Sequence, residues 1–403
     1  MKKTIIKMFS AAAMGAAVIA MAGCSAQGSA AAKGNSAKGN SAKGDKIKIG
    51  LNMELSGAAA GYGEQQKQGF ELAVKQINKD GGIKVGNKKM KVQTVVQDNK
   101  STTSGSASVA AQLSTKDQVT AIVGPATTND GTASIPNITK AYVPSVSPSA
   151  TDPDYTLQKN GKVQTYVFRA CFNNDLQGQT AAHFANNQLK AKNVAILQDN
   201  SSDYGTGLAK AFKQTFKGKI ASTQSFSEGD KDFNALLTTI KSKHVDAIYV
   251  PGYYSEVGLI IKQARQAGIT TPFIGSDGMA DPKLAQIAGP HNASNIYYTT
   301  PFSTKAGDTN KVAKQFMTDF KQEYGSDAPT FSALAYDSML MIKQAIEDSK
   351  STNSVKVAQA LAKIKDMPAV TGTTSVDKHH DPEKPIVVEQ LTNGKVTGAT
   401  AVK

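Results

Sequence analysis

The sequence is poor in cysteine and in aromatic residues, and it has only one apolar run that could concern a membrane. Its two cysteines, Cys24 and Cys171, are too few for a disulfide scaffold or a cysteine-rich zinc site. Aromatic residues make up 6 %, there is no tryptophan, and no basic patch is interleaved with stacking aromatics as in nucleic-acid-binding proteins. The apolar run, residues 8–22, lies at the extreme N-terminus, which excludes a polytopic membrane protein.

The charge of the chain is strongly positive but unevenly placed. Its 403 residues, enough for two or three domains, carry a formal net charge of +14. The first 45 residues contribute six lysines and one aspartate, which leaves +9 for residues 46–403. The lysines of that part are scattered rather than grouped. We therefore interpret the charge as the surface charge of a protein that faces an anionic cell wall, and we expect no nucleic-acid partner.

Residues 1–23 have the pattern of a bacterial signal peptide. Three lysines within the first seven residues precede the apolar run, which is short for a membrane-spanning helix and typical of an export leader. The segment Met21–Cys24, Met-Ala-Gly-Cys, resembles a lipobox with Met21 in place of the usual leucine. We predict that Cys24 carries a lipid anchor that holds the protein on the outer face of the cell membrane. The alternative is an ordinary secretory signal in which Cys24 has no role.

Residues 24–45 are predicted to be the lipidated cysteine followed by a flexible linker. Ser, Ala, Gly, Lys and Asn make up almost all of this segment, and the motif AKGNS occurs twice, at Ala32–Ser36 and at Ala37–Ser41. None of these side chains can build a core, so we expect the segment to act as a tether.

The remainder of the chain alternates short β-branched runs with amphipathic helical runs. This alternation predicts an α/β fold with doubly wound, mostly parallel sheets. A helix at residues 132–142 is expected to break near Pro136, a strand at 164–171 restarts the cycle, and an Asn-Gly turn joins the last strands. We predict two Rossmann-like lobes with a hinge and an interlobe cleft. Lobe 1 is expected to contain residues 46–168 and 300–375, and lobe 2 residues 169–299 and 376–403.

No constellation of catalytic residues is visible. The sequence lacks a GxSxG nucleophile elbow, a GxxxxGK[ST] phosphate loop and an HExxH zinc motif. Cys171 has no identifiable base partner, and we interpret it as a small buried residue. The run His379-His380-Asp381 precedes a proline and is interpreted as an exposed turn rather than a metal site. We therefore predict that the protein is not an enzyme and uses no cofactor or metal.

Polar loops follow several predicted strands and supply hydroxyls, backbone N–H groups, tyrosines and one acid. Because the carboxyl ends of parallel strands meet at one edge of a sheet, we expect these loops to line the cleft. Hydroxyls and helix-start N–H groups suit a carboxylate, the acid Asp277 suits an ammonium group, and an aromatic wall suits an apolar side chain. The set therefore favours an amino-acid zwitterion. The loops are Gly124–Asp130, Ser147–Pro153, Asp199–Gly205, Pro251–Glu256 and Gly275–Gly278.

Six segments at matching spacing resemble the leucine/isoleucine/valine-binding proteins of ABC importers, which have the type I periplasmic-binding fold. The resemblance covers nearly all of residues 46–403 and implies a receptor that binds a branched-chain L-amino acid between its lobes. It also implies delivery of that ligand to a membrane permease driven by ATPase subunits, without catalysis, by a monomer. The segments are residues 55–83, 121–128, 143–153, 203–212, 252–268 and 272–284.

Residue by residue, the resemblance implies eleven ligand-binding positions. Thr128 matches a hydroxyl that binds the ligand carboxylate, and Asp277 matches the acid that pairs with the ammonium group, where many relatives have Glu. The loop residues Ser149, Ala150 and Thr151 match a segment that holds both charged groups. The aromatic wall, the lid and the pocket lining are implied to be Tyr62, Tyr204, Tyr253, Phe331, Ala126 and Thr127.

Plainer interpretations of these residues remain open. Thr128 could be only a helix N-cap, Tyr62 and Tyr204 could cap helices, Phe331 could be helix core, and Asp277 could be a turn residue. The same fold could also bind another small amino acid, an amide or a peptide, or it could serve a surface sensor lipoprotein. An esterase or metal hydrolase would need motifs that the sequence lacks.

Overall fold

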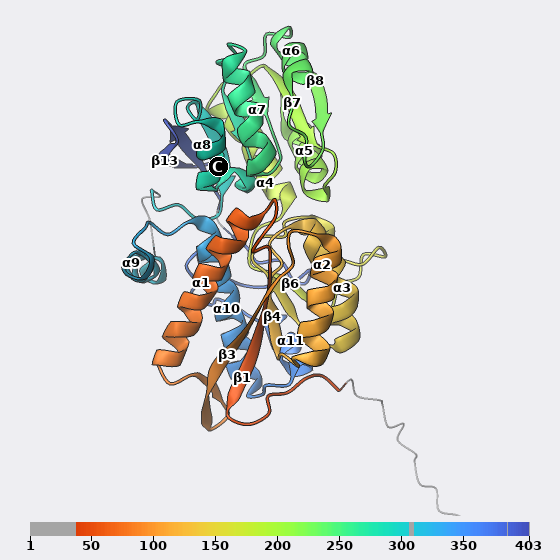
Figure 1. Ribbon diagram of the computed structural model, residues 1–403, viewed down its shortest axis with the longest axis vertical. Coiled ribbons are helices and arrows are strands. Elements are labelled where there is room, and N and C mark those ends of the chain that lie inside the picture. Colours follow the sequence, from red (N-terminus) through yellow and green to blue (C-terminus); the bar gives the residue numbers. More distant parts are fainter. Residues whose placement is uncertain (1–37, 306–309, 385, 403) are drawn as a thin grey trace, which may run out of the picture. The chain divides into compact units, whose positions relative to one another are not determined.

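Two β-sheets, each flanked by helices, organise the chain. The computed structural model describes residues 38–305, 310–384 and 386–402, and one compact unit extends from Ala37 to the C-terminus. Figure 1 shows the two sheets within this unit. We call the six-stranded sheet with its helices lobe 1, and the seven-stranded sheet with its helices lobe 2. The predicted α/β class is confirmed.

Lobe 1 has the strand order β2-β3-β1-β4-β5-β6, in which every neighbouring pair is parallel except β2 and β3. The inner strands β4 and β5 are buried at every residue, as expected for parallel strands covered on both faces. The strands are β1 (Lys46–Met53), β2 (Ile83–Val85), β3 (Lys88–Asp98), β4 (Ala121–Val123), β5 (Ser145–Ser147) and β6 (Val167–Arg169).

Lobe 2 has the strand order β13-β12-β11-β10-β9-β7-β8, which is parallel except for the two C-terminal strands. The predicted Asn-Gly turn joins these two strands. Asn393 and Gly394 both have positive φ, as a two-residue hairpin turn of this kind requires. The strands are β7 (Asn193–Asp199), β8 (Lys219–Phe226), β9 (Ala247–Tyr249), β10 (Phe273–Gly275), β11 (Ile296–Thr300), β12 (Val387–Thr392) and β13 (Lys395–Ala401).

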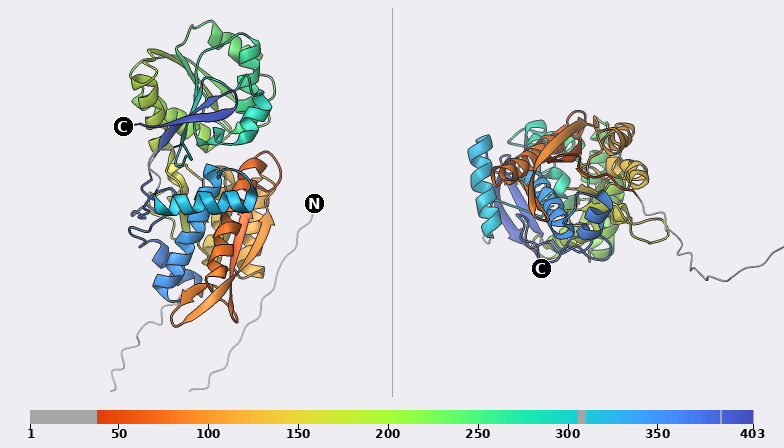
Figure 2. Two further views of the ribbon diagram at one scale, coloured as in Figure 1. Left: turned by 90° about the vertical axis from the view of Figure 1, so that its left-hand side faces the viewer. Right: turned by 90° about the horizontal axis from the view of Figure 1, so that it is seen from below.

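Helices lie along both sheets in the views of Figure 2. Those of lobe 1 are α1 (Ala60–Lys79), α2 (Thr103–Ala111), α3 (Thr128–Ala141), α9 (Lys311–Tyr324), α10 (Thr330–Ser349) and α11 (Ser354–Leu361). Those of lobe 2 are α4 (Asn174–Asn187), α5 (Asp203–Thr215), α6 (Asn234–Lys241), α7 (Tyr254–Gln266) and α8 (Pro282–Ala288). The chain passes between the lobes from β6 to α4, from β11 to α9 and from α11 to β12. We call these passages the first, second and third crossings.

The strand expected at 164–171 is β6, which pairs with β5 in the lobe 1 sheet. One expectation about secondary structure is wrong. The helix expected to break at Pro136 continues through it as α3. Ile135 and Ile138 are buried in the core on either side of the proline, and this packing outweighs the one hydrogen bond that proline removes.

The end of the predicted linker is part of the folded unit. The Asn40 side-chain amide donates to the backbone carbonyls of Ser114, at 2.7 Å, and of Val119, at 3.1 Å. The backbone N–H of Ser354 donates to the carbonyl of Asn40 at 2.8 Å. Residues 38–45 are therefore held on lobe 1 by polar contacts, which differs from the tether expected to reach residue 45.

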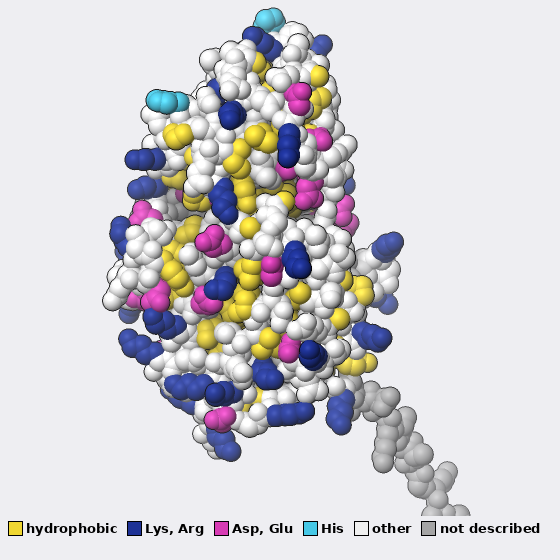
Figure 3. Space-filling model, viewed as in Figure 1, with side chains coloured by type: hydrophobic (Ala, Val, Ile, Leu, Met, Phe, Trp, Pro, Cys, Tyr) yellow, Lys and Arg dark blue, Asp and Glu magenta, His cyan; other side chains and the backbone are white. Residues whose placement is uncertain are grey.

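The predicted signal peptide, residues 1–23, and Cys24 lie outside the described residues. None of the described helices has the length and hydropathy needed to span a membrane. Figure 3 shows Lys and Arg side chains spread over the face in view and mixed with acidic ones. On this face the positive charge does not gather in a single patch.

Candidate functional site

Segments from both lobes meet around one small cavity. Of the eleven predicted ligand-binding residues, eight line it, together with Gly278. The side chains of the wall nearly fill the cavity, and the free space left, about 10 Å³, is about that needed for one water molecule. A molecule larger than water therefore fits only if the lobes move apart. The lining residues are Tyr62, Ala126, Thr127, Ser149, Tyr204, Tyr253, Asp277, Gly278 and Phe331.

The acid of the cavity is Asp277, which follows β10 and is buried. The Tyr204 hydroxyl lies 2.7 Å from its Oδ1 and donates to it. Burial raises the pKa of Asp277 to about 6, although hydrogen bonds from Tyr204 and Gln177 act in the opposite direction. Among the described residues that line the cavity, none is Lys, Arg or His. A charged Asp277 therefore has no cationic partner in the cavity wall.

Aromatic rings from both lobes form the apolar part of the wall. The ring of Tyr62, near the start of α1, lies 4.8 Å from that of Phe331 in α10 and 5.8 Å from that of Tyr253, measured between ring centroids. Tyr204 stacks on Tyr253 at 4.8 Å with the ring planes within 8°. These contacts fix the four rings around the space beside Asp277 and give it an apolar side.

The remaining predicted residues, Thr128, Ala150 and Thr151, are buried beside the lining residues in sequence but are not part of the wall. The hydroxyls of Thr128 and Thr151 have no hydrogen-bond partner among the described residues, although buried hydroxyls normally have one. Thr128 is not the N-cap of α3, because the Thr127 hydroxyl accepts the bond from the Asp130 N–H. Both hydroxyls are therefore uncommitted among the described residues.

The backbone N–H of Ala150 does not have this freedom. It donates to the Ser147 hydroxyl at 2.9 Å, so it is already used within its own loop. The Ser149 hydroxyl is also held, since it donates to the carbonyl of Ala126 at 2.8 Å and accepts from the Gln66 amide at 2.7 Å. Ala150 and Ser149 thus shape the loop, which leaves Thr151 as its uncommitted hydroxyl.

Sequence reasoning missed Glu54, which follows β1 and is fully buried. Its carboxylate accepts from the backbone N–H groups of Ala126 at 2.9 Å and of Thr127 at 3.1 Å. These donors precede α3 and were expected to face a ligand. Burial and the nearby Glu54 carboxylate raise the pKa of Asp130 to about 8. The available signal was an acid directly after an apolar strand, at the same sheet edge as the polar loops.

A larger cavity lies away from this site, with Tyr298, Phe302, Ala328 and Glu389 in its wall. Its buried acid Glu389 already accepts a hydrogen bond from the Tyr298 hydroxyl at 2.6 Å. None of the eleven predicted ligand-binding residues lines it, whereas eight of them line the smaller cavity. We therefore place the candidate site at the smaller cavity.

The two other groups singled out in the sequence have structural roles. The segment forms the expected turn, but His380 is buried rather than exposed, and its ring stacks on Phe168 at 4.1 Å between centroids. Burial lowers its pKa. Cys171 is fully buried as predicted, and burial raises the pKa of its thiol, so it is not a reactive thiolate. No cluster of three or more potential metal ligands occurs among the described residues.

Comparison with known proteins assigns the family. A periplasmic binding protein family model matches residues 46–395. The chain belongs to the periplasmic binding protein family. The Leu/Ile/Val-binding protein BraC3 of Rhizobium johnstonii is 33 % identical over 339 residues, which cover 83 % of this chain and 88 % of that protein. The leucine-, isoleucine-, valine-, threonine- and alanine-binding protein of Pseudomonas aeruginosa is 30 % identical over 320 residues, 79 % of this chain and 82 % of that one.

Solved structures agree with this assignment. The substrate-binding protein LivJ from Streptococcus pneumoniae, a branched-chain amino acid transporter component in complex with isoleucine, matches with a TM-score of 0.84 at 42 % identity. That match covers 89 % of this chain and 99 % of LivJ. A benzoate complex of a solute-binding protein from R. palustris has a TM-score of 0.75 at 19 % identity, over 89 % of this chain and 97 % of that one, and shares the fold alone.

In this periplasmic binding protein, hydrogen bonds hold the two lobes together around the cavity. The Tyr62 hydroxyl donates to the carbonyl of Gly278 at 2.6 Å and accepts from the Tyr254 N–H at 3.1 Å. The Gln65 amide of lobe 1 donates to the Asp281 carboxylate of lobe 2 at 2.8 Å. The lobes are therefore in contact along the edge of the cavity, with Tyr62 as the residue that spans it.

Proposed function

We propose that this chain is an extracytoplasmic receptor that captures a branched-chain L-amino acid, Leu, Ile or Val, between its lobes. In this proposal the loaded receptor delivers its ligand to the permease and ATPase subunits of an ABC importer, and no catalysis occurs. A monomer is held at the membrane by a lipid on Cys24. The observation that carries the proposal is the buried carboxylate of Asp277 in a cavity walled by aromatic rings.

The chemistry of the cavity supports a zwitterion with an apolar side chain. A buried carboxylate is costly unless a cation pairs with it, and the ligand ammonium group would supply that cation to Asp277. The buried hydroxyls of Thr128 and Thr151 and the first-turn N–H groups of α3, which have no acceptor within the helix, would bind the ligand carboxylate. The rings of Tyr62, Tyr253 and Phe331 would contact an aliphatic side chain.

The relatives support the same class of ligand. The proteins from R. johnstonii and P. aeruginosa are named for binding leucine, isoleucine and valine, and the solved S. pneumoniae protein holds isoleucine. The P. aeruginosa protein is also named for threonine and alanine, so the ranking among small amino acids must be measured on this chain.

Thermal unfolding of the purified protein in the presence of each of the twenty amino acids tests the proposal. A ligand at about 100 times its Kd adds about 2.7 kcal/mol of stability, which should raise the Tm by several degrees. Calorimetry or tyrosine emission must report, because the chain has no tryptophan. We expect Leu, Ile or Val to raise the Tm. A shift with another amino acid alone would change the specificity, and no shift with any would contradict amino-acid binding.

Binding should also weaken in acid. Only the ionised form of Asp277 pairs with an ammonium group, so affinity should fall towards tenfold per pH unit below about pH 6. The stability of the ligand-free protein should change in the opposite direction. The folded-state pKa of Asp277, about 6, lies above its unfolded value, so protonation favours the folded state as the pH falls from 6 towards 4.

Calorimetric titration with leucine from pH 8 to pH 5 measures the loss of affinity in acid. The stability of the ligand-free protein is tested with the Asp277→Asn variant. This variant should be more stable than the wild type at pH 8, and the difference should shrink by pH 5. An affinity that is flat from pH 7 to pH 5 would show that Asp277 does not bind the ammonium group.

A further inference from the structure

A buried arginine at the end of β6 holds the loop that carries Ser149 and Thr151. The side chain of Arg169 is fully buried, and its Nη1 donates to the carbonyl of Ala150 at 2.9 Å. Its Nη2 donates to the Thr156 hydroxyl at 3.1 Å. One guanidinium thus contacts this loop and the turn that follows it, and the planar donors of arginine allow only a narrow range of loop positions.

The first crossing holds the same loop at a second point. The backbone N–H of Asn174, the first residue of α4, donates to the carbonyl of Thr151 at 2.7 Å. The Cys171 thiol also lies 3.5 Å from the carbonyl of Ala150. The carbonyls of Ala150 and Thr151 are therefore both bound by residues at or beside the passage from lobe 1 to lobe 2.

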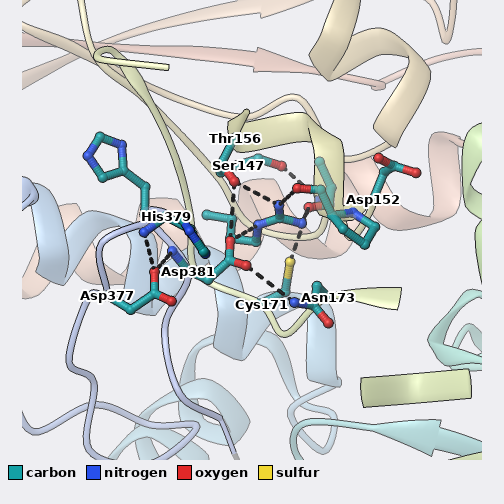
Figure 4. A network of polar contacts seen from close by, with 12 residues as sticks. Ser147, Asp152, Thr156, Cys171, Asn173, Asp377, His379 and Asp381 are labelled. Atoms are coloured by element: carbon teal, nitrogen blue, oxygen red, sulfur yellow. Dashed lines mark hydrogen bonds and ion pairs between the residues drawn. The ribbon is translucent and has the colours of Figure 1, made fainter. Parts of the chain in front are cut away.

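The charge of Arg169 is balanced from the third crossing. Asp381 lies between α11 and β12, and its Oδ1 is 2.7 Å from Arg169 Nε (Figure 4). The second oxygen of Asp381 accepts from the Asn173 amide at 3.3 Å. Asp381 thus contacts two residues of the first crossing, and one ion pair links two of the three connections between the lobes.

The turn that carries Asp381 is itself held in place. The Asp377 carboxylate accepts from the N–H groups of His379, at 2.8 Å, and of Asp381, at 2.9 Å (Figure 4). His380 stacks on Phe168 of β6, and its Nδ1 lies 2.9 Å from the carbonyl of Val167. The turn is therefore docked on β6 next to Arg169.

We propose that Arg169 and Asp381 are positioning residues for ligand binding, which couple the loop at residues 149–151 to the arrangement of the lobes. The inference rests on the proposed function. When the lobes rotate about their crossings, a loop that is bound directly to residues at the first crossing, and through Arg169 and Asp381 to the third, must move with them. The ion pair therefore sets the position of the Thr151 hydroxyl and the closed arrangement of the lobes together, although neither residue lines the cavity.

The Asp381→Asn variant tests this coupling. It keeps the size of the side chain and removes its charge, so Arg169 loses its counterion and the loop is less firmly held. We expect the Kd for leucine, isoleucine or valine, whichever the wild type binds, to rise at least tenfold in calorimetry. The dissociation rate should rise more than the association rate falls. The Asp381→Glu variant restores the charge and should recover part of the affinity.

A matched control separates positioning from general loss of stability. Asp337 forms another buried ion pair with a residue of the third crossing, Lys384, whose Nζ lies 3.7 Å from Asp337 Oδ2. The Asp337→Asn variant removes the negative charge of this pair. Asp337 accepts from the N–H groups of Val370 and Thr371 and makes no contact with the loop at residues 149–151. We expect both variants to unfold at lower urea concentration and only Asp381→Asn to lose affinity.

Three outcomes would overturn the inference and leave the proposed function intact. Unchanged affinity of a folded Asp381→Asn variant would do so, and so would an equal loss of affinity in Asp337→Asn. If Asp381→Asn does not fold, the milder Thr156→Val variant serves instead, because it removes the hydroxyl between Arg169 and Asp381. Its Kd should rise about threefold or more. An unchanged Kd would contradict the coupling. A wild type that binds none of the three amino acids would instead overturn the proposed function, and this inference with it.

Discussion

Replacing Asp277 by asparagine is expected to weaken binding of a branched-chain amino acid by at least a hundredfold. Closure buries the ligand ammonium group, and Asp277 is the acid among the residues that line the cavity. Removing one partner of a buried ion pair typically costs about 3–5 kcal/mol, because the other charge is left without compensation. A hundredfold loss corresponds to about 2.7 kcal/mol, so it is a lower bound. Calorimetric titration of the wild type and the variant measures the loss.

Glu389→Gln is the matched control for this prediction. Glu389 is also a buried acid of lobe 2, it also accepts a hydrogen bond from a tyrosine hydroxyl, and burial also raises its pKa. It lies in the wall of the other cavity. Its neutralisation should leave the affinity within about twofold of the wild type. An equal loss in both variants would mean that any buried acid of lobe 2 affects binding through stability, and Asp277 would lose its assigned role.

The position of Asp277 illustrates what the sequence could predict. An apolar strand followed by a short polar loop places an acid at the carboxyl end of a parallel sheet, and the pattern is local enough to recognise. Each of the eight predicted residues that line the cavity follows a strand or lies near the start of a helix. Segments far apart in the chain therefore meet at one cavity.

The partners of these residues were harder to predict. Glu54 binds N–H groups of Ala126 and Thr127, more than seventy residues later, and nothing in the local sequence indicates that these donors are occupied. The pairing of Arg169 with Asp381 spans still more of the chain and joins two crossings. Such long-range polar contacts leave no periodic pattern, so hydropathy and spacing cannot reveal them.

The start of the folded unit was placed too late for a related reason. Hydropathy identifies segments that bury apolar side chains, and residues 38–45 have almost none. Asn40 is held instead by hydrogen bonds of its side-chain amide and its backbone carbonyl. Low-complexity composition therefore gave no indication of the fixed polar contacts that this segment makes.

The Thr128→Val variant should lower affinity without lowering stability. Its hydroxyl is buried and has no hydrogen-bond partner among the described residues, so valine removes an unsatisfied polar group at little change of shape. The ligand-free protein should be as stable as the wild type or more stable. The ligand carboxylate loses one charge-assisted hydrogen bond, worth about 1.5–3 kcal/mol, so the Kd should rise roughly tenfold to a hundredfold. Urea unfolding and calorimetric titration measure the two effects.

Thr120→Val is the control that makes this result specific to the site. Thr120 is as deeply buried as Thr128, and its hydroxyl is also unpartnered among the described residues. Thr120 lies just before the amino end of β4, whereas Thr128 lies beyond its carboxyl end. Both variants should show the same direction of stability change. Only Thr128→Val should lose affinity, because only the hydroxyl at the carboxyl end of the strand can reach a ligand held between the lobes. Equal affinities of the two variants would exclude Thr128 from the site and leave Thr151 as the remaining uncommitted hydroxyl for the carboxylate.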